Sequence, residues 1–341
     1  MMRALVLAAG LGTRLRPLTE NLPKPLMPLL GRRLIDGAFA TLAAANIDDI
    51  AVNAHHQADT LHAALADGTP FGQSVRVVDE PTILGTGGAI KNLRDFLGAS
   101  DLFVVLNGDT LSRPDLAGAI ERHRASGAMA TLVLKRDPRS ERYGAVEVDA
   151  DGGVVDLAGL VGATGVDRGL FIGAQIVSPT IFEHMPSDDV FCVVRQVYRP
   201  LVETHPGRVR AVFTDGPFED LGTPDDYAAA QFRLLAEGPA HFAEFFEDLL
   251  CVDDGFWQGD DADVSNEAMI ATPVFFGAGA IVEGSAHIGP NAVVGAGAIV
   301  GDGATVRNAI VMPGVRVASG AVVENVVVGE GYEAALADAG P

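Results

Sequence analysis

The chain has 341 residues and a formal net charge of −21, and 48% of its residues are hydrophobic while 20% are charged, as in ordinary globular proteins. Such an acidic chain is a poor partner for nucleic acids and anionic membranes, because both are bound by clustered Lys and Arg. The apolar run from Met1 to Ala9 is too short for a signal peptide or a membrane span, so we expect a cytoplasmic protein that binds neither nucleic acid nor membrane.

Short apolar runs alternate with amphipathic stretches over the first two thirds of the chain. The runs predict buried strands at Ala4–Ala8, Ile50–Asn53, Val75–Val78, Leu102–Leu106 and Ala130–Leu134. The stretches between them predict helices at Leu34–Ala45, Ala58–Ala66, Ala89–Phe96 and Asp115–Ala125. This alternation predicts an α/β fold with a Rossmann-like, mostly parallel sheet that binds ligands at the carboxyl ends of its strands.

Two further features complete this part of the chain. An antiparallel hairpin is expected at Tyr143–Asp156, with its turn at Asp149–Gly153. A helix over Asp225–Leu235 follows Thr223, which we expect to be its N-cap. A Gly-Pro pair ends that helix, and another helix is expected at Ala240–Leu250.

From Ile270 onward an apolar side chain recurs every six residues. The repeat consists of Ile270, Phe276, Val282, Ile288, Val294, Val300, Val306 and Met312. A period of six fits neither a helix nor a strand, but it fits a parallel β-helix, in which each side of a triangular coil takes six residues. About three coils are expected, with a slip in register after Met312, because Val317 and Val323 come one place early.

These patterns predict four segments. They are a catalytic domain at 1–238, a helical linker at 239–267, a hexapeptide-repeat β-helix at 268–330 and a flexible tail at 331–341. The apolar walls and open ends of a short β-helix favour burial against another subunit. We therefore expect a homo-oligomer.

The loop after the first predicted strand carries the strongest signal in the sequence. It reads Ala8-Ala-Gly-Leu-Gly-Thr-Arg14, and Pro23-Lys-Pro25 follows it. Backbone N–H groups of a glycine-rich loop can approach a polyphosphate, whose charge Arg14 and Lys24 can neutralise. The dinucleotide fingerprint needs a third glycine where Leu15 stands, and the Walker A sequence Gly-Lys-Ser/Thr is absent.

These segments resemble the signature of the sugar-phosphate nucleotidyltransferases, or NDP-sugar pyrophosphorylases. The resemblance covers about residues 2–236 and continues in order through five further motifs: Glu80–Ala89, Asn107–Asp109, Tyr143-Gly144, Phe171–Gly173 and Glu219–Pro224. The repeat fits as well, since many members carry a left-handed β-helix at the C-terminus. The resemblance implies transfer of a nucleotidyl group from a nucleoside triphosphate to a sugar 1-phosphate, with release of pyrophosphate.

The resemblance also implies roles for individual residues. Arg14 and Lys24 match the family residues that contact the phosphates, and Asp109 and Asp220 match those that hold Mg²⁺. The remaining substrate-binding candidates lie in the same motifs: Ala9, Gly10, Gly12, Thr13 and Glu80; Gly85, Thr86, Gly87 and Gly88, which would face the base; Asn107 and Gly108; and Gly144 and Gly173, which would contact the sugar.

The chemistry of the reaction agrees with these roles. A sugar phosphate is already an ionised nucleophile, so the reaction needs positioning and charge neutralisation rather than a general base. Asp109 follows the apolar strand Leu102–Leu106 and would emerge at the ligand edge of the sheet. Asp220 lies just before a helix N-cap, on a loop that could fold back to the same edge. Mg²⁺ typically takes one or two carboxylates together with phosphate oxygens.

The substrate pair remains open. The family often carries a Glu-Lys-Pro after the hairpin, whose lysine contacts the sugar phosphate, but Val155–Leu160 has no lysine. The hairpin region and the Thr-Gly-Gly motif resemble the N-acetylmuramate-1-phosphate uridylyltransferase branch, whereas the repeat resembles the mannose-1-phosphate guanylyltransferase branch. GTP with mannose 1-phosphate, UTP with N-acetylmuramate 1-phosphate, and dTTP with glucose 1-phosphate all stay possible.

Two other functions are less favoured. A non-catalytic nucleotide-sugar sensor or assembly subunit would be marked by loss of Arg14, Lys24, Asp109 or Asp220, and all four are present. An acyltransferase β-helix would need more coils and a catalytic histidine, and the repeat offers His287 alone. The pair His55-His56 has no third ligand at a convincing spacing, so we expect a surface pair and not a metal site.

Overall fold

The computed structural model describes residues 2–337, which form two compact units. Unit 1 runs from the N-terminus to Leu11 and from Ile35 to Phe218. Unit 2 combines Gly12–Leu34 with the chain from Glu219 onward. Within the described residues, no helix is both long and apolar enough to cross a membrane.

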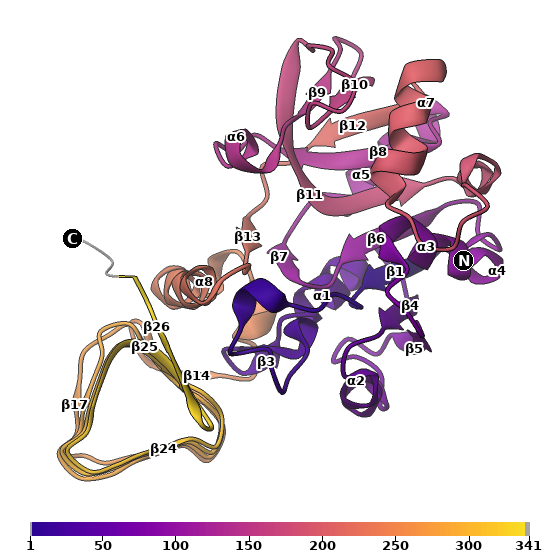
Figure 1. Cartoon of the computed structure of the whole chain (residues 1–341). Helices are drawn as coiled ribbons and strands as arrows, with labels where there is room; N and C mark the ends of the chain where they lie inside the picture. The colour runs from indigo at the N-terminus through magenta and orange to yellow at the C-terminus, as the bar shows by residue number, and fades with distance from the viewer. Residues whose placement is uncertain (1, 338–341) are drawn as a thin grey trace. The chain divides into compact units, whose positions relative to one another are not determined.

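Four parallel strands form one side of the unit 1 sheet, in the order β6-β1-β4-β5, with β5 at the edge (Figure 1). They are β6 (Phe103–Asn107), β1 (Arg3–Leu7), β4 (Asp49–Ala54) and β5 (Ser74–Asp79). The side chains of β1, β4 and β6 are mostly apolar and buried, as expected for a sheet covered on both faces. The predicted α/β fold with a parallel-dominated sheet is confirmed.

The sheet continues beyond β6 through antiparallel strands. Here β11 (Asp167–Val177) pairs with β6, with β8 (Ala130–Lys135) and with β9 (Val146–Val148). Beyond them, β12 (Val209–Phe213) runs parallel to β8, and β10 (Val154–Leu157) pairs with β9. The β9–β10 pair is the predicted hairpin. Asp149 closes its turn by accepting hydrogen bonds from the N–H groups of Asp151 and Gly153.

The four helices predicted for unit 1 form near their predicted positions, as α1 (Asp36–Ala44), α2 (Ala58–Leu65), α3 (Gly85–Asn92) with α4 (Arg94–Leu97), and α5 (Leu116–Ser126). Two helices that were not predicted also form, α6 (Ser140–Tyr143) and α7 (Arg199–Thr204). The helix expected at Ala89–Phe96 begins earlier, at Gly85, and is broken at Leu93 into α3 and α4. The glycine-rich turn is therefore the first turn of α3.

In unit 2, residues 12–34 pack with chain that follows more than 180 residues later in the sequence. This segment contains short 3₁₀ turns at Thr13–Leu15 and Lys24–Leu26 and the strands β2 (Pro28–Leu29) and β3 (Arg32–Arg33). The Leu30 N–H donates to Gln231 of α8 (Pro224–Glu237), and the Tyr227 hydroxyl of the same helix donates to the Pro28 carbonyl. Thr223 caps α8 as predicted, in a reciprocal capping box with Asp226.

The helix predicted at Ala240–Leu250 does not form. The chain makes 3₁₀ turns at Gly238–Ala240 and Ala243–Phe245, and then a strand, β14 (Leu250–Asp253). Phe242, Phe245 and Phe246 are all buried. Their i, i+3, i+4 spacing is that of one helical face, which is why the pattern predicted a helix. Contacts with other segments hold the chain in another form: the Glu244 carbonyl accepts a hydrogen bond from Arg32, and β14 pairs with β15 (Phe256–Gln258).

The C-terminal strands stack as a parallel β-helix with a triangular cross-section (Figure 1). The strands are β15 (Phe256–Gln258), β16 (Asp263–Val264), β17 (Met269–Ile270), β18 (Val274–Phe276), β19 (Ile281–Val282), β20 (His287–Ile288), β21 (Ala292–Val294), β22 (Ile299–Val300), β23 (Thr305–Val311), β24 (Arg316–Val317) and β25 (Val322–Gly329). Val264, Val282, Val300 and Val317 occupy equivalent positions in successive coils. The predicted six-residue apolar repeat thus forms the core of the coil.

The slip in register occurs before Met312, not after it. Val294 pairs with Val311, so Val311 takes the core position that the repeat assigned to Met312. The missing residue is absorbed at Asn308, which has φ +49° and belongs to a ladder in which Asn291, Asn308 and Asn325 hydrogen-bond side chain to side chain. Of the tail expected at 331–341, Tyr332–Ala335 forms β26 against β25, and 338–341 lie outside the described residues.

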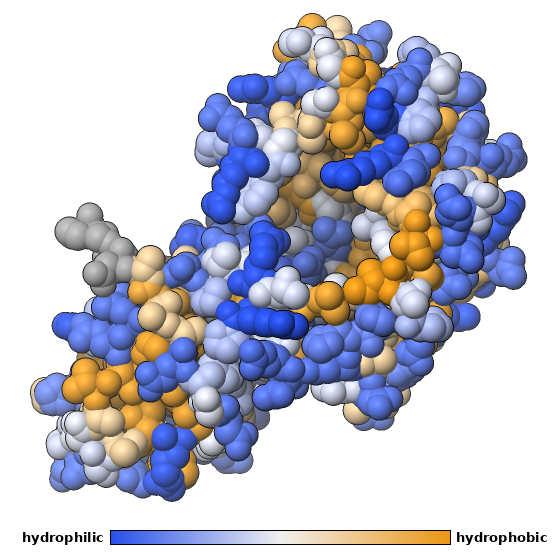
Figure 2. Space-filling view, viewed as in Figure 1, coloured by the Kyte–Doolittle hydropathy of each residue, from blue (hydrophilic) through white to orange (hydrophobic). Residues whose placement is uncertain are grey.

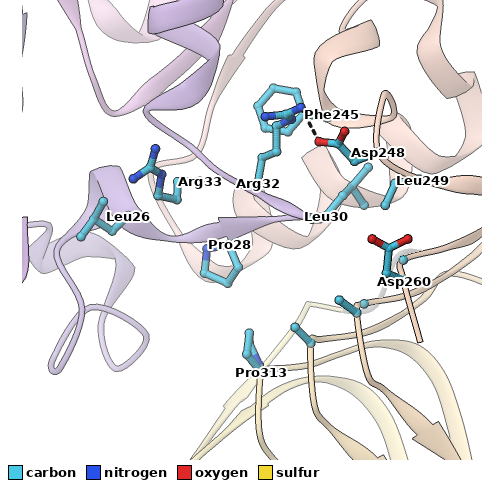
Figure 3. Close-up of a pocket in the computed structure, with 15 residues that line it drawn as sticks. Leu26, Pro28, Leu30, Arg32, Arg33, Phe245, Asp248, Leu249, Asp260 and Pro313 are labelled. Carbon is cyan, nitrogen blue, oxygen red and sulfur yellow. Dashed lines mark hydrogen bonds and ion pairs between the residues drawn. The ribbon is translucent and has the colours of Figure 1, made fainter. Parts of the chain in front are cut away.

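A cavity of about 330 Å³ lies within unit 2, between the β2–β3 hairpin and the corners of the β-helix (Figure 3). Leu26, Leu30, Phe245 and Leu249 give it an apolar lining, and Arg32 binds Asp248 at its rim at 2.6 Å. None of the predicted site residues lines this cavity.

Candidate active site

The carboxyl ends of three strands bring polar residues to one edge of the unit 1 sheet. Leu7 at the end of β1 pairs with Asn53 of β4 on one side and with Asn107 of β6 on the other. The glycine-rich loop leaves the sheet directly after Leu7, so Ala9 and Gly10 begin at the same edge as Asn107. The predicted gathering of ligand-binding residues at strand ends is thus seen for the part of the site within unit 1.

The segment Asn107-Gly108-Asp109 continues the parallel pairing of β6 with β1 to this edge. The Gly108 N–H donates to the Leu7 carbonyl at 2.9 Å, and a Cβ on Gly108 would lie 2.8 Å from Val6 Cγ1. Glycine is required here because any side chain would strike β1. This close contact with β1 places the half-buried Asp109 just beyond the carboxyl end of β1.

Gly173 is fitted against Asn107. It has φ +79°, and a Cβ there would lie 2.5 Å from Asn107 Nδ2. Gly144 also has a positive φ, +92°, but a Cβ on it would meet the Cβ of Ala158 at 2.4 Å. Gly173 therefore supports a predicted site residue, whereas the space beside Gly144 is needed by the chain that follows the hairpin.

The glycines of α3 allow a second loop to approach closely. A Cβ on Gly87 would overlap the Phe191 ring, and one on Gly88 would lie 2.1 Å from the Asp189 carbonyl oxygen. Gly85 has φ +72° and lies against the Phe191 carbonyl. The Thr86 hydroxyl accepts the Val193 N–H at 3.1 Å. This turn is consequently shaped by its contact with residues 189–193.

The cationic residues of the predicted site belong to unit 2. Gly12, with φ +60°, begins the first 3₁₀ turn, and a Cβ on it would lie 3.3 Å from Lys24 Cβ. Lys24 is 5% exposed, whereas Thr13 and Arg14 are exposed. Arg14 lies beside Gly222, where a Cβ would be 3.1 Å from its guanidinium. Unit 2 thus brings together Gly12 and Lys24, and brings Arg14 to the segment that carries Asp220.

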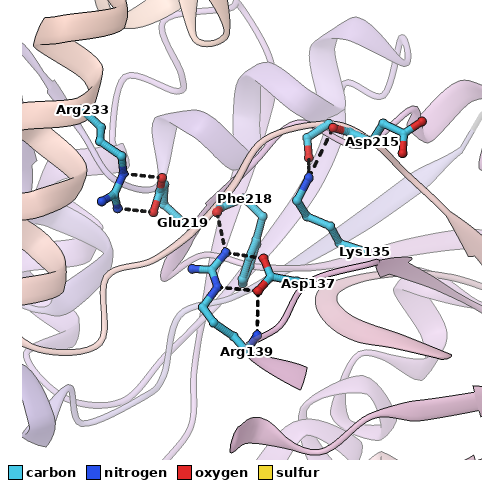
Figure 4. Close-up of polar contacts among 8 residues, drawn as sticks. Lys135, Asp137, Arg139, Asp215, Phe218, Glu219 and Arg233 are labelled. Carbon is cyan, nitrogen blue, oxygen red and sulfur yellow. Dashed lines mark hydrogen bonds and ion pairs between the residues drawn. The ribbon is translucent and has the colours of Figure 1, made fainter. Parts of the chain in front are cut away.

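The segment that leads to Asp220 is anchored residue by residue (Figure 4). In unit 1, Lys135 donates to the Gly216 carbonyl at 2.7 Å, and Arg139 donates to the Phe218 carbonyl at 3.1 Å. Arg139 also holds Asp137 at 2.7 Å, and this hydrogen bond keeps the pKa of the Asp137 carboxyl below its usual value. In unit 2, Glu219 forms a bidentate pair with Arg233 at 2.6 and 2.8 Å. Asp220 ends β13 (Phe218–Asp220) immediately afterwards.

Comparison with known proteins identifies the family. The nucleotidyl transferase family model matches residues 3–237, and a second model, the GMPPB C-terminal domain, matches residues 270–334. The chain belongs to the nucleotidyl transferase family. The predicted membership and the predicted enzyme class, nucleotidyl transfer to a sugar 1-phosphate, are confirmed.

Named relatives of this nucleotidyl transferase differ in sugar and in base, since a UTP–glucose-1-phosphate uridylyltransferase of Synechocystis is also 30% identical, over 69% of this chain and 64% of the relative. A mannose-1-phosphate guanylyltransferase of Mycobacterium tuberculosis is 31% identical, over 84% of this chain and 76% of the relative. A D-glycero-α-D-manno-heptose 1-phosphate guanylyltransferase of Aneurinibacillus thermoaerophilus is 30% identical, over 68% of this chain and 98% of the relative. The crystal structure of HddC from Yersinia pseudotuberculosis complexed with GMP-PN has a TM-score of 0.57 and 27% identity, covering 69% of this chain and all of HddC.

The donor set suits magnesium, although it is divided between the units. Asp109 belongs to unit 1 and Asp220 to unit 2. Two carboxylates with phosphate oxygens form an all-oxygen set of the kind that Mg²⁺ prefers. Among residues 2–337 there is no cluster of three or more His, Cys, Asp or Glu side chains suited to a metal. Magnesium binding by Asp109 and Asp220 together, and the convergence that it requires, stay predictions.

Two residues of this nucleotidyl transferase have roles that the motifs did not reveal. Asn53 is 5% exposed and accepts the Ala8 N–H at 2.7 Å, at the start of the glycine-rich loop. His55 donates from Nδ1 to the Glu80 carbonyl at 2.7 Å, so it supports the protein backbone. The sequence did contain one signal for Asn53: it is a polar residue at the end of an apolar strand, as Asn107 is after Leu102–Leu106.

Proposed function

We propose that the protein catalyses magnesium-dependent transfer of a guanylyl group from GTP to mannose 1-phosphate or a related manno-configured sugar 1-phosphate. The observation that carries this choice is the extent of the similarity. The match to a mannose-1-phosphate guanylyltransferase spans 84% of the chain, and the GMPPB C-terminal model matches the β-helix. UTP with N-acetylmuramate 1-phosphate is the second candidate, which the resemblance of the hairpin region and the Thr-Gly-Gly motif to that branch favours.

In the proposed reaction a phosphate oxygen of the sugar 1-phosphate attacks the α-phosphorus of the nucleotide. A new P–O bond forms as the bond between the α-phosphorus and its bridging oxygen breaks, and pyrophosphate leaves with that electron pair. Arg14 and Lys24 would reduce the repulsion between the two anions and stabilise the leaving pyrophosphate. Asp109 and Asp220 would hold Mg²⁺, which neutralises phosphate charge.

A pyrophosphate-release assay tests this function directly. Each of GTP, UTP and dTTP is combined with mannose, N-acetylmuramate or glucose 1-phosphate, with and without Mg²⁺. We expect GTP with mannose 1-phosphate to give the highest kcat/KM and EDTA to abolish turnover. A higher kcat/KM for another pair would refute the substrate assignment, and release without sugar phosphate would refute the transfer.

Variants connect the activity to the site. Removing a central electrostatic contact commonly costs about 2.7–4 kcal/mol of transition-state stabilisation, so Asp109→Ala and Lys24→Ala should each lose about two to three orders of magnitude in turnover. Asp101→Ala is the matched control, because Asp101 is an exposed aspartate that precedes β6, at the opposite end of that strand from Asp109. Near-normal rates in the two site variants, with unchanged unfolding, would contradict the roles assigned to them.

We also propose a homo-oligomer that associates through the β-helix part of unit 2. Figure 2 shows apolar patches on this part, and its exposed apolar side chains include Leu250 (65%), Val252 (49%) and Val322 (69%). The double variant Leu250→Glu with Val252→Glu should lower the mass measured by light scattering without changing the unfolding midpoint. A monomeric wild-type protein would refute the proposal.

A further inference from the structure

We propose that Asn53 and Glu80 form a buried relay that fixes the glycine-rich loop relative to the turn at Gly85–Gly88. Asn53 is then a positioning residue for the nucleotide, at a place that neither the motifs nor the comparisons assign. The inference rests on the proposed function, because that function makes these two segments the nucleotide-binding elements.

Three hydrogen bonds form the relay, all within unit 1. The Ala8 N–H donates to Asn53 Oδ1 at 2.7 Å, and Asn53 Nδ2 donates to Glu80 Oε1 at 2.8 Å. Glu80 Oε2 then accepts the Leu84 N–H at 3.0 Å. The Asn53 and Glu80 residues are only 5% and 3% exposed, so water competes little for these contacts. Glu80, which the sequence suggested as a substrate ligand, uses both carboxylate oxygens within the protein and is assigned here a positioning role instead.

Both ends of the relay reach the proposed nucleotide site. Ala8 is the first residue after β1, where the chain turns into the glycine-rich loop. Leu84 immediately precedes α3, and its carbonyl accepts the Phe191 N–H at 3.0 Å. Glu80 itself is held by its backbone, because its N–H donates to the Ala54 carbonyl and its carbonyl accepts from His55. A shift at Asn53 would therefore move both segments.

The polarity of the relay restricts which pair of side chains can complete it. Both terminal groups, the N–H of Ala8 and the N–H of Leu84, are donors and need acceptors. An amide supplies an acceptor oxygen and an N–H₂ donor group, and a carboxylate supplies two acceptor oxygens, so Asn followed by Glu gives both terminal N–H groups an acceptor and pairs the two side chains. The reverse order, Asp at 53 and Gln at 80, satisfies the same groups with the same net charge. Other combinations leave a buried donor or acceptor unpaired, which is costly.

This reciprocity provides the test. Asn53→Leu and Glu80→Gln each break the relay, and Asn53→Asp sets two carboxylates against each other. Because a misplacement of about 1 Å can cost about 100-fold, we expect these single variants to raise the KM for the nucleotide and the Kd for mant-GTP by about 10- to 100-fold. The double variant Asn53→Asp with Glu80→Gln should return both values to within about threefold of the wild-type values, a recovery that a residue needed only for packing would not show.

Amide hydrogen exchange provides a readout that does not depend on catalysis. In the unliganded protein, Asn53→Leu should speed exchange at Ala8 and at Leu84, and the double variant should restore protection at both. The relay is refuted if the double variant binds mant-GTP no better than the single variants, or if Asn53→Leu leaves exchange at Leu84 unchanged. Restored exchange in a protein that turns over no substrate pair would instead refute the proposed function and leave the relay standing.

Discussion

Replacing Gly173 by alanine tests how β11 supports Asn107. Gly173 has φ +79°, and an added Cβ would lie 2.5 Å from Asn107 Nδ2 and 2.6 Å from its Cγ. A left-handed backbone costs an L-residue about 1–2 kcal/mol. Inserting a methyl group into filled space costs about 1–3 kcal/mol more. We therefore expect Gly173→Ala to lower the free energy of unfolding by about 2–5 kcal/mol.

Gly127→Ala is the matched control, because it separates the two costs. Gly127 has φ +64°, in the same left-handed region, but an added Cβ there meets no atom within 4 Å. It should lose only the backbone part, about 1–2 kcal/mol, and keep full turnover. Gly173→Ala should in addition lose about 10- to 100-fold in kcat/KM, because the new methyl group displaces Asn107 at the proposed site.

Urea unfolding and pyrophosphate release measure the two effects separately. Activity is compared at a temperature where both variants are fully folded. The reasoning about Asn107 is refuted if the two variants lose equal stability and Gly173→Ala retains wild-type turnover.

Three further predictions concern stability. Burial, aided by the neighbouring charge of Arg124, lowers the pKa of His123 to about 4. The unfolded state therefore binds a proton more readily, and the free energy of unfolding should fall as the pH drops from about 6.5 towards 4. Urea titrations at several pH values should show that His123→Gln flattens this dependence. Asn308 has φ +49° in the asparagine ladder, so Asn308→Gly should lose only the side-chain hydrogen bonds, about 1–2 kcal/mol of unfolding free energy. Asn308→Ala should lose about 1 kcal/mol more, because alanine disfavours the left-handed backbone. An unfolding midpoint of Asn308→Gly equal to that of the wild type would count against the ladder. Arg139→Met should raise the pKa of the Asp137 carboxyl towards its usual value. The protein should then lose the stability that the lowered pKa provides at pH values above the usual carboxyl pKa. An unchanged chemical-shift titration of Asp137 would refute this.

Most of unit 1 could be predicted because its signals are local. The apolar runs that become β1, β4 and β6 are buried on both faces, and such strands read directly as continuous apolar segments. The hairpin turn at Asp149 and the cap at Thr223 are likewise encoded within a few residues. The apolar repeat identified the β-helix for the same reason, since each coil uses the same short pattern.

What the sequence did not reveal depends on contacts between distant segments. The helix expected at Ala240–Leu250 is replaced by turns and a strand, where the Glu244 carbonyl accepts from the distant Arg32 and β14 pairs with β15. The roles of Gly87 and Gly88 follow from residues 189–193, which carry no motif. Asn53 and Glu80 lie 27 residues apart, and their pairing follows from the parallel register of β4 and β5.

The fold also divides a motif that is continuous in the sequence. The glycine-rich loop begins in unit 1, but Arg14 and Lys24 belong to unit 2 with α8 and the β-helix. Within unit 2, Tyr227 of α8 connects the segment 12–34 with the β-helix, since its hydroxyl donates to the Pro28 carbonyl and lies 3.9 Å from Met312 Sδ. Burial raises the pKa of the Tyr227 hydroxyl, which therefore remains a donor. The β-helix thus packs, through one buried tyrosine, against the segment that carries the cationic residues, and this gives it a structural reason to accompany a nucleotidyl transferase domain whether or not it binds anything itself.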